Sequence, residues 1–438
     1  MMYEIYGFPH WEARGSTTTD LMVYNTKSER KEKFEPLENK TVKIYVCGPT
    51  VYDVPHIGHG RSYVFFDVVR RYLEFLGYRV TLVTNFTDTE ESITRRAHEL
   101  GKQPAKLAEE MIQVFLKEMD QLGVKRADIY PRVTEHINDI IDMAQRLVQM
   151  GYAYVVDGEV FFDVKKAGGY GAVVNRPVEE LIASEGGESV PAASSGKRSP
   201  SDFALWRKEK PGEPSWESPW GHGRPGWHIE CSAMATKYLG SMIDIEGGGQ
   251  DLIFPHHECS SLICQTRFGK PFAKYYLHNG FITVNKQKMS KSKANFVTLR
   301  EVLKKYDYQV VRFFLLKRRY REPLEYDDKE MAEAERNLGR IQAAIKKAVK
   351  ASAAKSGKAC IEAEKKLVSE LVEAKGKFIE AMNDDLNTEQ AVNTLLRVSL
   401  CIEEFAETCK RFTSEETGQE AKAICRQFND VMGVCRKL

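Results

Sequence analysis

The sequence lacks a long hydrophobic run, an excess of charge of one sign and a dense set of cysteines. No apolar stretch approaches the roughly 18 residues that span a bilayer, and residues 1–14 lack the apolar core of a secretion signal. The 64 lysines and arginines nearly balance the 62 aspartates and glutamates, so only a local cluster of charge could bind nucleic acid. We therefore expect a cytoplasmic protein without a membrane segment, with a monomer as the simplest assembly.

The cysteines are too few and too scattered to form a disulfide framework. Nine of them, an odd number, are spread over 438 residues, which is typical of a reducing compartment. Five lie where we expect C-terminal helices, and a cysteine there is usually a small buried hydrophobic residue: Cys360, Cys401, Cys409, Cys425 and Cys435. Cys47 and Cys231 have more polar surroundings in the sequence than these five: Gly48 follows Cys47, and His228 and Glu230 precede Cys231.

A strand–helix–strand unit is predicted near the N-terminus. Residues 42–47 (VKIYVC) and 80–84 (VTLVT) read as buried strands, and helical spacing of apolar residues runs from about His59 to just before Gly77. Such a unit implies a parallel sheet with a right-handed crossover. Residues 104–150 read as helical, and Asp157-Gly158 predicts a hairpin turn between two further strands.

The predicted fold is α/β: a Rossmann-like, doubly wound parallel sheet with an α+β insertion, followed by an α-helical bundle. We expect an N-terminal extension and the start of the catalytic domain in residues 1–40, and the two halves of that domain in 41–103 and 216–326. The insertion would occupy 104–215. Four helices predicted from helical periodicity make 327–438 the bundle.

Two segments have the composition of phosphate-binding loops. Residues 55–60 (PHIGHG) place two histidines and two glycines at a helix N-terminus, which favours an anion, although a glycine turn with two surface histidines fits equally well. Residues 288–292 (KMSKS) place two lysines within reach of a triphosphate, whereas taken alone they are more often a solvated basic turn. No G-x-x-x-x-G-K-[ST] phosphate loop is present.

Cys47, Cys231 and His256 are candidate metal ligands. Two thiolates and an imidazole suit zinc, and three protein ligands leave an open position, as a catalytic site requires. Their separation in sequence means that spacing alone does not reveal a site. Each residue by itself would be read as a buried cysteine or an ordinary histidine.

Longer blocks of sequence carry a resemblance to one family. Residues 47–53 (CGPTVYD), 223–234 (GRPGWHIECSAM) and 247–258 (GGGQDLIFPHHE), with the two phosphate segments, resemble the cysteinyl-tRNA synthetases of class I, over about residues 21–434. The resemblance implies activation of L-cysteine by ATP with Mg²⁺ to cysteinyl-adenylate, then transfer to the 3′ end of tRNA(Cys). It also implies one zinc ion on Cys47, Cys231 and His256, which would bind the substrate thiol and so reject serine.

The resemblance implies roles for individual residues. The catalytic residues would be His56 and His59, which stabilise the α-phosphate, and Lys288 and Lys291, which close on pyrophosphate. ATP would also contact Gly58, Gly249, Asp251 and Lys291. Thr87 and Trp227 would line the cysteine pocket.

The sequence departs from the family pattern in places that bear on the zinc and on the acceptor. Ser260 stands where the family has a glutamate as a fourth zinc ligand, so we expect three protein ligands and water, with Cys259 a less favoured substitute. Residues 317–321 (KRRYR) would either grip RNA phosphates or form a solvated run of charge. The chain ends at Leu438, where the family continues into a small anticodon-reading domain, so we expect that module to be missing.

The acceptor has an alternative. A tRNA-independent cysteine:amine ligase, resembling the ligase of mycothiol synthesis, uses the same adenylate chemistry and also lacks the anticodon domain and the zinc-binding glutamate. A non-catalytic RNA-binding relative is a third reading, which the intact phosphate segments disfavour. We favour tRNA because the full-length bundle and the synthetase pattern are both retained.

Overall fold

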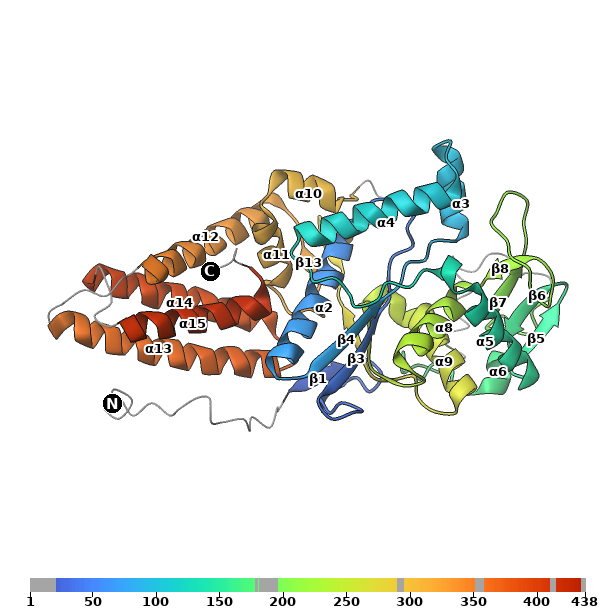
Figure 1. The fold of residues 1–438 in the computed structure, drawn as a ribbon, viewed down its shortest axis with the longest axis horizontal. Helices are drawn as coiled ribbons and strands as arrows, with labels where there is room; N and C mark the ends of the chain where they lie inside the picture. The colour runs from blue at the N-terminus through green and yellow to red at the C-terminus, as the bar shows by residue number, and fades with distance from the viewer. Residues whose placement is uncertain are drawn as a thin grey trace.

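A four-stranded parallel sheet forms the centre of the molecule (Figure 1). The computed structural model describes residues 21–177, 180, 196–289, 295–350, 358–409 and 415–434. The strand order is β10 (Ala273–Asn279), β9 (Ile243–Gly249), β3 (Thr41–Val46) and β4 (Arg79–Thr84). The chain proceeds from β3 to one side and later from β9 to the other, so the strand order reverses between these two central strands. Ligands bind at such a switch point, beyond the carboxyl ends of the strands.

Helices cover both faces of the sheet, as the prediction of a doubly wound fold requires. Helix α2 (Ile57–Phe75) lies on one face, and α8 (Trp227–Leu239) and α9 (Glu258–Phe268) lie on the other. Successive side chains of β3 alternate between them. Ile44 and Val46 pack in the core with α2, whereas Tyr45 and Cys47 pack in the core that contains Cys231 of α8.

The predicted α+β insertion is present, and it shares a hydrophobic core with α8 and α9. An antiparallel sheet combines β5 (Ala153–Val156), β6 (Glu159–Phe162), β7 (Phe203–Lys208) and β8 (Gly223–Pro225). Asp157 and Gly158 form the predicted hairpin turn, both with positive φ. The insertion also contains the 3₁₀ turn η2 (Val133–Glu135), α5 (Ile137–Gln149) and the short α6 (Val164–Ala167). Helix α3 (Glu91–Glu99) precedes it. Helix α4 (Pro104–Gln121) lies within the expected bounds 104–215, but its apolar face packs into the core of the central sheet, and β8 lies beyond those bounds.

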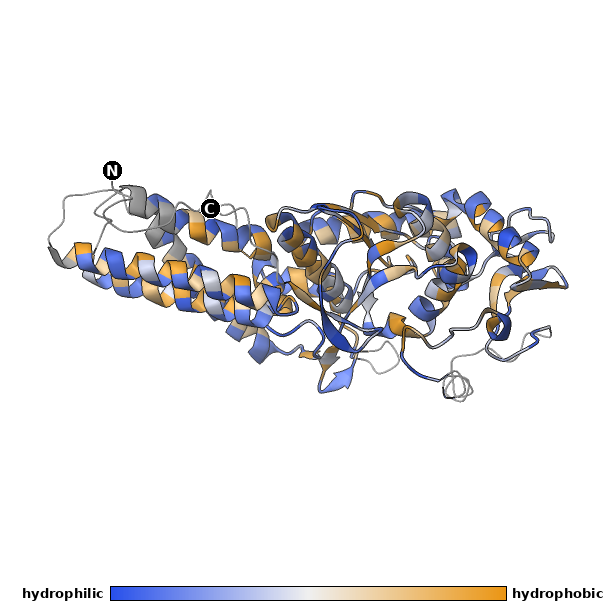
Figure 2. Ribbon diagram, turned by 90° about the horizontal axis from the view of Figure 1, so that it is seen from below, coloured by the Kyte–Doolittle hydropathy of each residue, from blue (hydrophilic) through white to orange (hydrophobic). Residues whose placement is uncertain are grey.

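The helical bundle lies at the opposite end of the elongated molecule from the insertion (Figure 1). Its helices are α12 (Asp328–Lys350), α13 (Lys358–Asn383), α14 (Thr388–Thr408) and α15 (Glu415–Met432), which confirms the predicted bundle. Apolar and polar residues alternate around these helices in Figure 2, as expected for amphipathic helices that share one core.

Smaller elements connect the central sheet to the bundle. The hairpin β1 (Met22–Asn25) and β2 (Arg30–Lys33) precedes β3. Strands β11 (Ile282–Val284), β12 (Gln287–Lys288) and β13 (Leu324–Glu325) form a small sheet after β10. Helices α10 (Leu299–Lys305) and α11 (Tyr308–Leu316) then lead into the bundle.

The basic segment 317–321 joins the catalytic half to the bundle. Lys317 pairs with Glu330 and Glu333, Arg318 with Glu389, Arg319 with Asp384, and Arg321 with Asp385. These carboxylates all belong to the bundle or its connections. The cations therefore form ion pairs within the fold, and the segment is not a freely solvated run of charge.

Two features of the C-terminal part bear on the sequence expectations. Cys360 and Cys409 form a disulfide between the start of α13 and the end of α14, so the expectation of buried thiols is wrong for this pair. Cys401 is half-buried, Cys425 is buried, and Cys435 lies outside the described residues. Within the described ranges, no helix combines the length and the apolar character that crossing a membrane requires.

Candidate active site

A cavity of about 330 Å³ lies beyond the ends of β3 and β9, at the switch point of the sheet. Every predicted site residue that the structure describes lines it: Cys47, His56, Gly58, His59, Thr87, Trp227, Cys231, Gly249, Asp251, His256 and Lys288. Lys291 lies outside the described residues. Residues brought from five separate stretches of sequence thus meet in one place, as the switch-point rule predicts.

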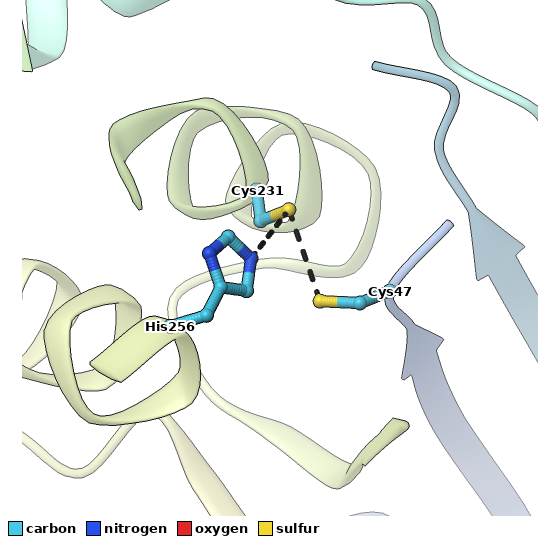
Figure 3. Close-up of side chains that lie close together, drawn as sticks. All are labelled: Cys47, Cys231 and His256. Atoms are coloured by element: carbon cyan, nitrogen blue, oxygen red, sulfur yellow. Dashed lines mark hydrogen bonds between the residues drawn. The ribbon is translucent and has the colours of Figure 1, made fainter. Parts of the chain in front are cut away.

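Two thiols and an imidazole converge at the inner end of the cavity (Figure 3). Cys47 directly follows β3, Cys231 lies on α8, and His256 lies in the irregular turn η4 (Ile253–His257). The two Sγ atoms are 3.8 Å apart, and His256 Nε2 is 3.3 Å from Cys231 Sγ. All three side chains are buried, and their donor atoms lie within 4.8 Å of one another. This donor set fits zinc, which prefers thiolate and imidazole ligands.

The two thiols differ in acidity because of their surroundings. Burial raises the pKa of the Cys47 thiol well above its ordinary value. The hydrogen bond from Cys47 and the interaction with the neighbouring His256 outweigh burial and lower the pKa of Cys231 well below its ordinary value. The pKa values of the two thiols are therefore shifted in opposite directions.

A chain of hydrogen bonds runs from Cys47 away from the cavity. His257 Nε2 is 3.1 Å from Cys47 Sγ, His257 Nδ1 is 2.8 Å from His278 Nε2, and His278 Nδ1 is 2.8 Å from Thr26 Oγ1. Burial lowers the pKa of His257 well below its ordinary value and that of His278 to about 3. Both imidazoles are therefore neutral and orient the Cys47 thiol. Sequence reasoning did not single out His257 or His278.

The side walls near the thiols contain the predicted substrate-binding residues. The Trp227 ring stacks on His256 with centroids 4.3 Å apart and is 40% exposed. The Thr87 hydroxyl donates to Glu230 at 3.2 Å. Gly48, the residue after Cys47, lies against the backbone that follows β4. A Cβ at position 48 would lie 1.5 Å from the carbonyl oxygen of Asn85. Only glycine permits that approach, which fixes the position of Cys47.

The opposite end of the cavity is formed by the N-terminus of α2. The His59 backbone N–H donates to His56 Nδ1, and the His56 N–H donates to His59 Nδ1, both at 3.2 Å. This is a reciprocal capping box with two histidines in place of the usual hydroxyl and carboxylate. The two rings stack with centroids 3.7 Å apart, and a Cβ at Gly58 would lie 2.8 Å from His56 Nδ1. The helix dipole and its first N–H groups make this end suitable for an anion.

The remaining predicted residues lie along the cavity between its two ends. Gly249 ends β9 and Asp251 lies in the short 3₁₀ turn η3 (Gln250–Leu252). Lys288 lies on β12, with Nζ 3.8 Å from the centroid of the Phe281 ring. The ring holds the start of the lysine–serine segment against the cavity through a cation–π contact.

Ser260 and Cys259 stand apart from the three metal-ligand candidates. The Ser260 hydroxyl oxygen lies 3.2 Å from both Glu246 Oε1 and the backbone carbonyl oxygen of His257, and these two acceptors share its single proton. Cys259 packs in the core of the insertion, as its helical position predicts. Glu246 of β9 was missed by sequence reasoning. Its signal was a single carboxylate in an otherwise apolar, buried strand, IDIEGGG.

Comparison with known proteins agrees with this geometry. Residues 33–336 match the model of the tRNA synthetases class I (C) catalytic domain, and residues 377–436 match that of the DALR domain. Over 415 residues, the chain is 48% identical to the cysteine–tRNA ligase of Thermococcus gammatolerans and 45% identical to that of Clostridioides difficile. These alignments cover 94% of this chain and 86% and 87% of the two relatives.

Solved structures show the same fold at low sequence identity. Mycobacterium tuberculosis methionyl-tRNA synthetase bound by methionyl-adenylate superposes with a TM-score of 0.63 at 15% identity, covering 90% of each chain. A LeuRS of Agrobacterium radiobacter in a ternary complex with tRNA gives 0.66 at 12%, covering 92% of this chain and 85% of that one. These two likenesses concern the fold alone, whereas the matches in sequence show the family. The chain belongs to the cysteine–tRNA ligase family of class I tRNA synthetases, and it is an aminoacyl-tRNA ligase.

Proposed function

We propose that the cavity activates L-cysteine with ATP and that the chain then transfers cysteine to the 3′ end of tRNA(Cys). The observation that carries the assignment of substrate is the group of Cys47, Cys231 and His256, whose buried donor atoms lie within 4.8 Å of one another at the inner end of the cavity. These residues would hold one zinc ion. When bound, zinc prefers a thiolate to an alcohol as a further ligand and so distinguishes cysteine from serine.

The protein's own residues position the amino acid. Trp227 covers His256 and remains partly exposed on the cavity side, so its ring can cover a bound cysteine as well. The Thr87 hydroxyl is held by Glu230, which fixes its direction in the wall. His257 and His278 hold the Cys47 thiol through the buried chain of hydrogen bonds.

Residues at the other end of the cavity would act on the nucleotide. His56 and His59 at the N-terminus of α2 would bind the α-phosphate and stabilise the charge that develops as the cysteine carboxylate attacks. Lys288, with Lys291 beyond the described residues, would bind the departing pyrophosphate together with Mg²⁺. Gly58, Gly249 and Asp251 would contact ATP, with the two glycines admitting the nucleotide close to the backbone.

In this proposal each segment of the chain forms one part of the enzyme. Residues 41–103 and 216–326 form the two halves of the catalytic domain, after an N-terminal part in 1–40; residues 104–215 form the insertion. The bundle, 327–438, would contact the tRNA, supported by the DALR match and by the names of the relatives. We expect a cytoplasmic monomer. A small amine as acceptor is the alternative, and no described feature of the cavity favours it.

The experiment separates metal, activation and acceptor. Cys231→Ala and His256→Ala are each expected to lose zinc and cysteine-dependent ATP–pyrophosphate exchange together. Cys264→Ala, which removes another fully buried thiol outside the group of three, is expected to retain both. Unchanged zinc content in the first two variants contradicts the assigned site. Pyrophosphate exchange without charging of tRNA(Cys), but with coupling of cysteine to an amine, contradicts the acceptor.

A further inference from the structure

Glu246 lies beneath the zinc-ligand candidates because of the register of the central sheet. Strands β3 and β9 are parallel, and Glu246 is the direct partner of Tyr45. Partners in register share a face, and Cys47 lies two residues beyond Tyr45, on that same face. Glu246 and Cys47 therefore both point toward α8 and α9. One carboxylate oxygen of Glu246, Cys47 Sγ and a ring nitrogen of His257 lie within 4.8 Å of one another.

The carboxylate of Glu246 is buried and only half satisfied. Its side chain is fully inaccessible, Oε1 accepts the Ser260 hydroxyl at 3.2 Å, and Oε2 has no hydrogen-bond partner. A buried polar atom without a partner costs roughly 1–3 kcal/mol, so such an atom in a native fold calls for an explanation. Glu246 does not line the cavity, whereas Cys47, Cys231 and His256 do. The Glu246 carboxylate is therefore not exposed to the space for substrate.

Ser260 connects this carboxylate to the departure from the family pattern. A serine at 260 is too short and too weakly acidic to replace a glutamate ligand. Its hydroxyl is instead hydrogen-bonded to the Glu246 carboxylate and to the carbonyl of His257. Helix α9 therefore contacts, through Ser260, the strand that carries the buried carboxylate of Glu246.

We infer that Glu246 supplies the carboxylate ligand of the zinc site from strand β9, with Ser260 orienting it. This rests on the proposed zinc site, and it replaces the expectation of three protein ligands and water. Zinc–ligand bonds are about 2.0–2.3 Å long, so two ligands of one ion lie at most about 4.5 Å apart. The Glu246 oxygen lies within 4.8 Å of Cys47 Sγ, and Cys47 is the residue that this group shares with Cys231 and His256. The fourth ligand enters from beneath, and the cavity side stays open for the cysteine thiol.

The test measures metal affinity and ligand field rather than turnover. Glu246→Gln, which is isosteric and neutral, is expected to lower zinc affinity by more than the roughly 10- to 100-fold that follows removal of a partner that only orients a ligand, measured in competition with a chromophoric chelator. It is also expected to shift the visible absorption bands of the cobalt-substituted protein. Because Glu246 is fully buried, Glu246→Asp serves as a second variant that keeps the charge; it should lose less affinity than Glu246→Gln. The double variant Glu246→Gln/Ser260→Glu, which moves the carboxylate to α9, is expected to regain zinc affinity.

Glu258→Gln is the matched control. Glu258 is also a buried glutamate beside this site, but its carboxylate accepts backbone N–H groups of Gly171, Val173 and Val174 and belongs to neither metal-ligand group. Its zinc affinity should match that of the parent protein. Unchanged zinc affinity and cobalt bands in Glu246→Gln, with zinc lost in Cys231→Ala, overturn the role of Glu246 and leave the proposed function standing. Zinc retained in Cys231→Ala overturns both.

Discussion

Two buried polar clusters lie on opposite faces of the central sheet, and they differ in how fully their groups are satisfied. On the α2 face, Asp67 accepts from Arg71, Arg312 and the Lys125 backbone, and Arg312 also donates to the carbonyl of Met432. On the α8 face, Glu246 Oε2 has no partner and two thiols share a small space with two imidazoles. A satisfied cluster requires no further partner, whereas an unsatisfied buried group calls for an explanation, and a bound ligand is one.

The satisfied cluster holds three parts of the chain together. Arg312 on α11 reaches Asp67 on α2, and its remaining donors reach the end of α15 and the turn after α4. Neither side chain of the Asp67–Arg312 pair is accessible to solvent. No donor or acceptor of this group points into the cavity, which is why it belongs to folding rather than to chemistry.

The largest expected effect comes from breaking the satisfied cluster. Arg312→Met should lower the free energy of unfolding by about 3–5 kcal/mol, because it leaves the Asp67 carboxylate buried beside one remaining arginine. Urea unfolding followed by circular dichroism measures this. Asp67→Asn/Arg312→Met, which removes both charges, should recover part of the loss. A loss below about 1 kcal/mol in the single variant would contradict the role given to the pair.

Removing metal is the corresponding change on the other face. Zinc at 100 times its dissociation constant should stabilise the fold by about 2.7 kcal/mol, so a chelator should lower the melting temperature of the parent protein. The chelator should lower the melting temperature of Asp67→Asn by the same amount, because the two clusters lie on opposite faces of the sheet and share no residue. Cys231→Ala should show no chelator effect. A chelator effect of the same size in Cys231→Ala would place the metal elsewhere.

The two clusters should also respond to pH in different ranges. Burial lowers the pKa of His278 to about 3, against about 6.5 in the unfolded chain. The unfolded state therefore binds the extra proton below about pH 6.5, and metal-free protein should lose up to about 1.4 kcal/mol of stability per pH unit as pH falls toward 3. His278→Asn should reduce this slope, measured by urea unfolding between about pH 7 and 5.

Asp67 should act only at lower pH. Burial raises the pKa of Asp67, but Arg312 and Arg71 outweigh it and hold the pKa below the ordinary value. Its stabilisation is present above the unfolded pKa of about 3.9 and is lost as pH falls below it. Asp67→Asn should therefore reduce the pH dependence of the free energy of unfolding only below about pH 3.9. If the free energy of unfolding changes with pH equally in His278→Asn and in the parent protein between about pH 5 and 6, the two clusters do not differ in their pH ranges in this way.

The sequence predicted what is periodic or local, and it missed what depends on contacts across the fold. The short apolar run at residues 42–47 placed Cys47 at the end of a buried strand, and the bundle helices were found from their spacing. The contact between Ser260 and Glu246 joins a helix to a strand, and no periodicity reports it. The basic segment 317–321 was likewise open to two readings, because its partners at 384, 385 and 389 lie more than 60 residues away.

The smallest expected effect tests a third kind of polar group, the exposed pair. The Arg318 side chain is 51% accessible and lies 3.0 Å from Glu389, so Arg318→Ala should cost only about 0.2–1 kcal/mol, and less at high salt. Arg321→Ala should cost more, because Asp385 is 3% accessible and the guanidinium also stacks on the Tyr24 ring at 3.9 Å. Urea unfolding at low and high ionic strength measures both. Equal losses in the two variants would mean that burial does not set the value of an ion pair here, and the distinction between the two buried clusters would lose its physical basis.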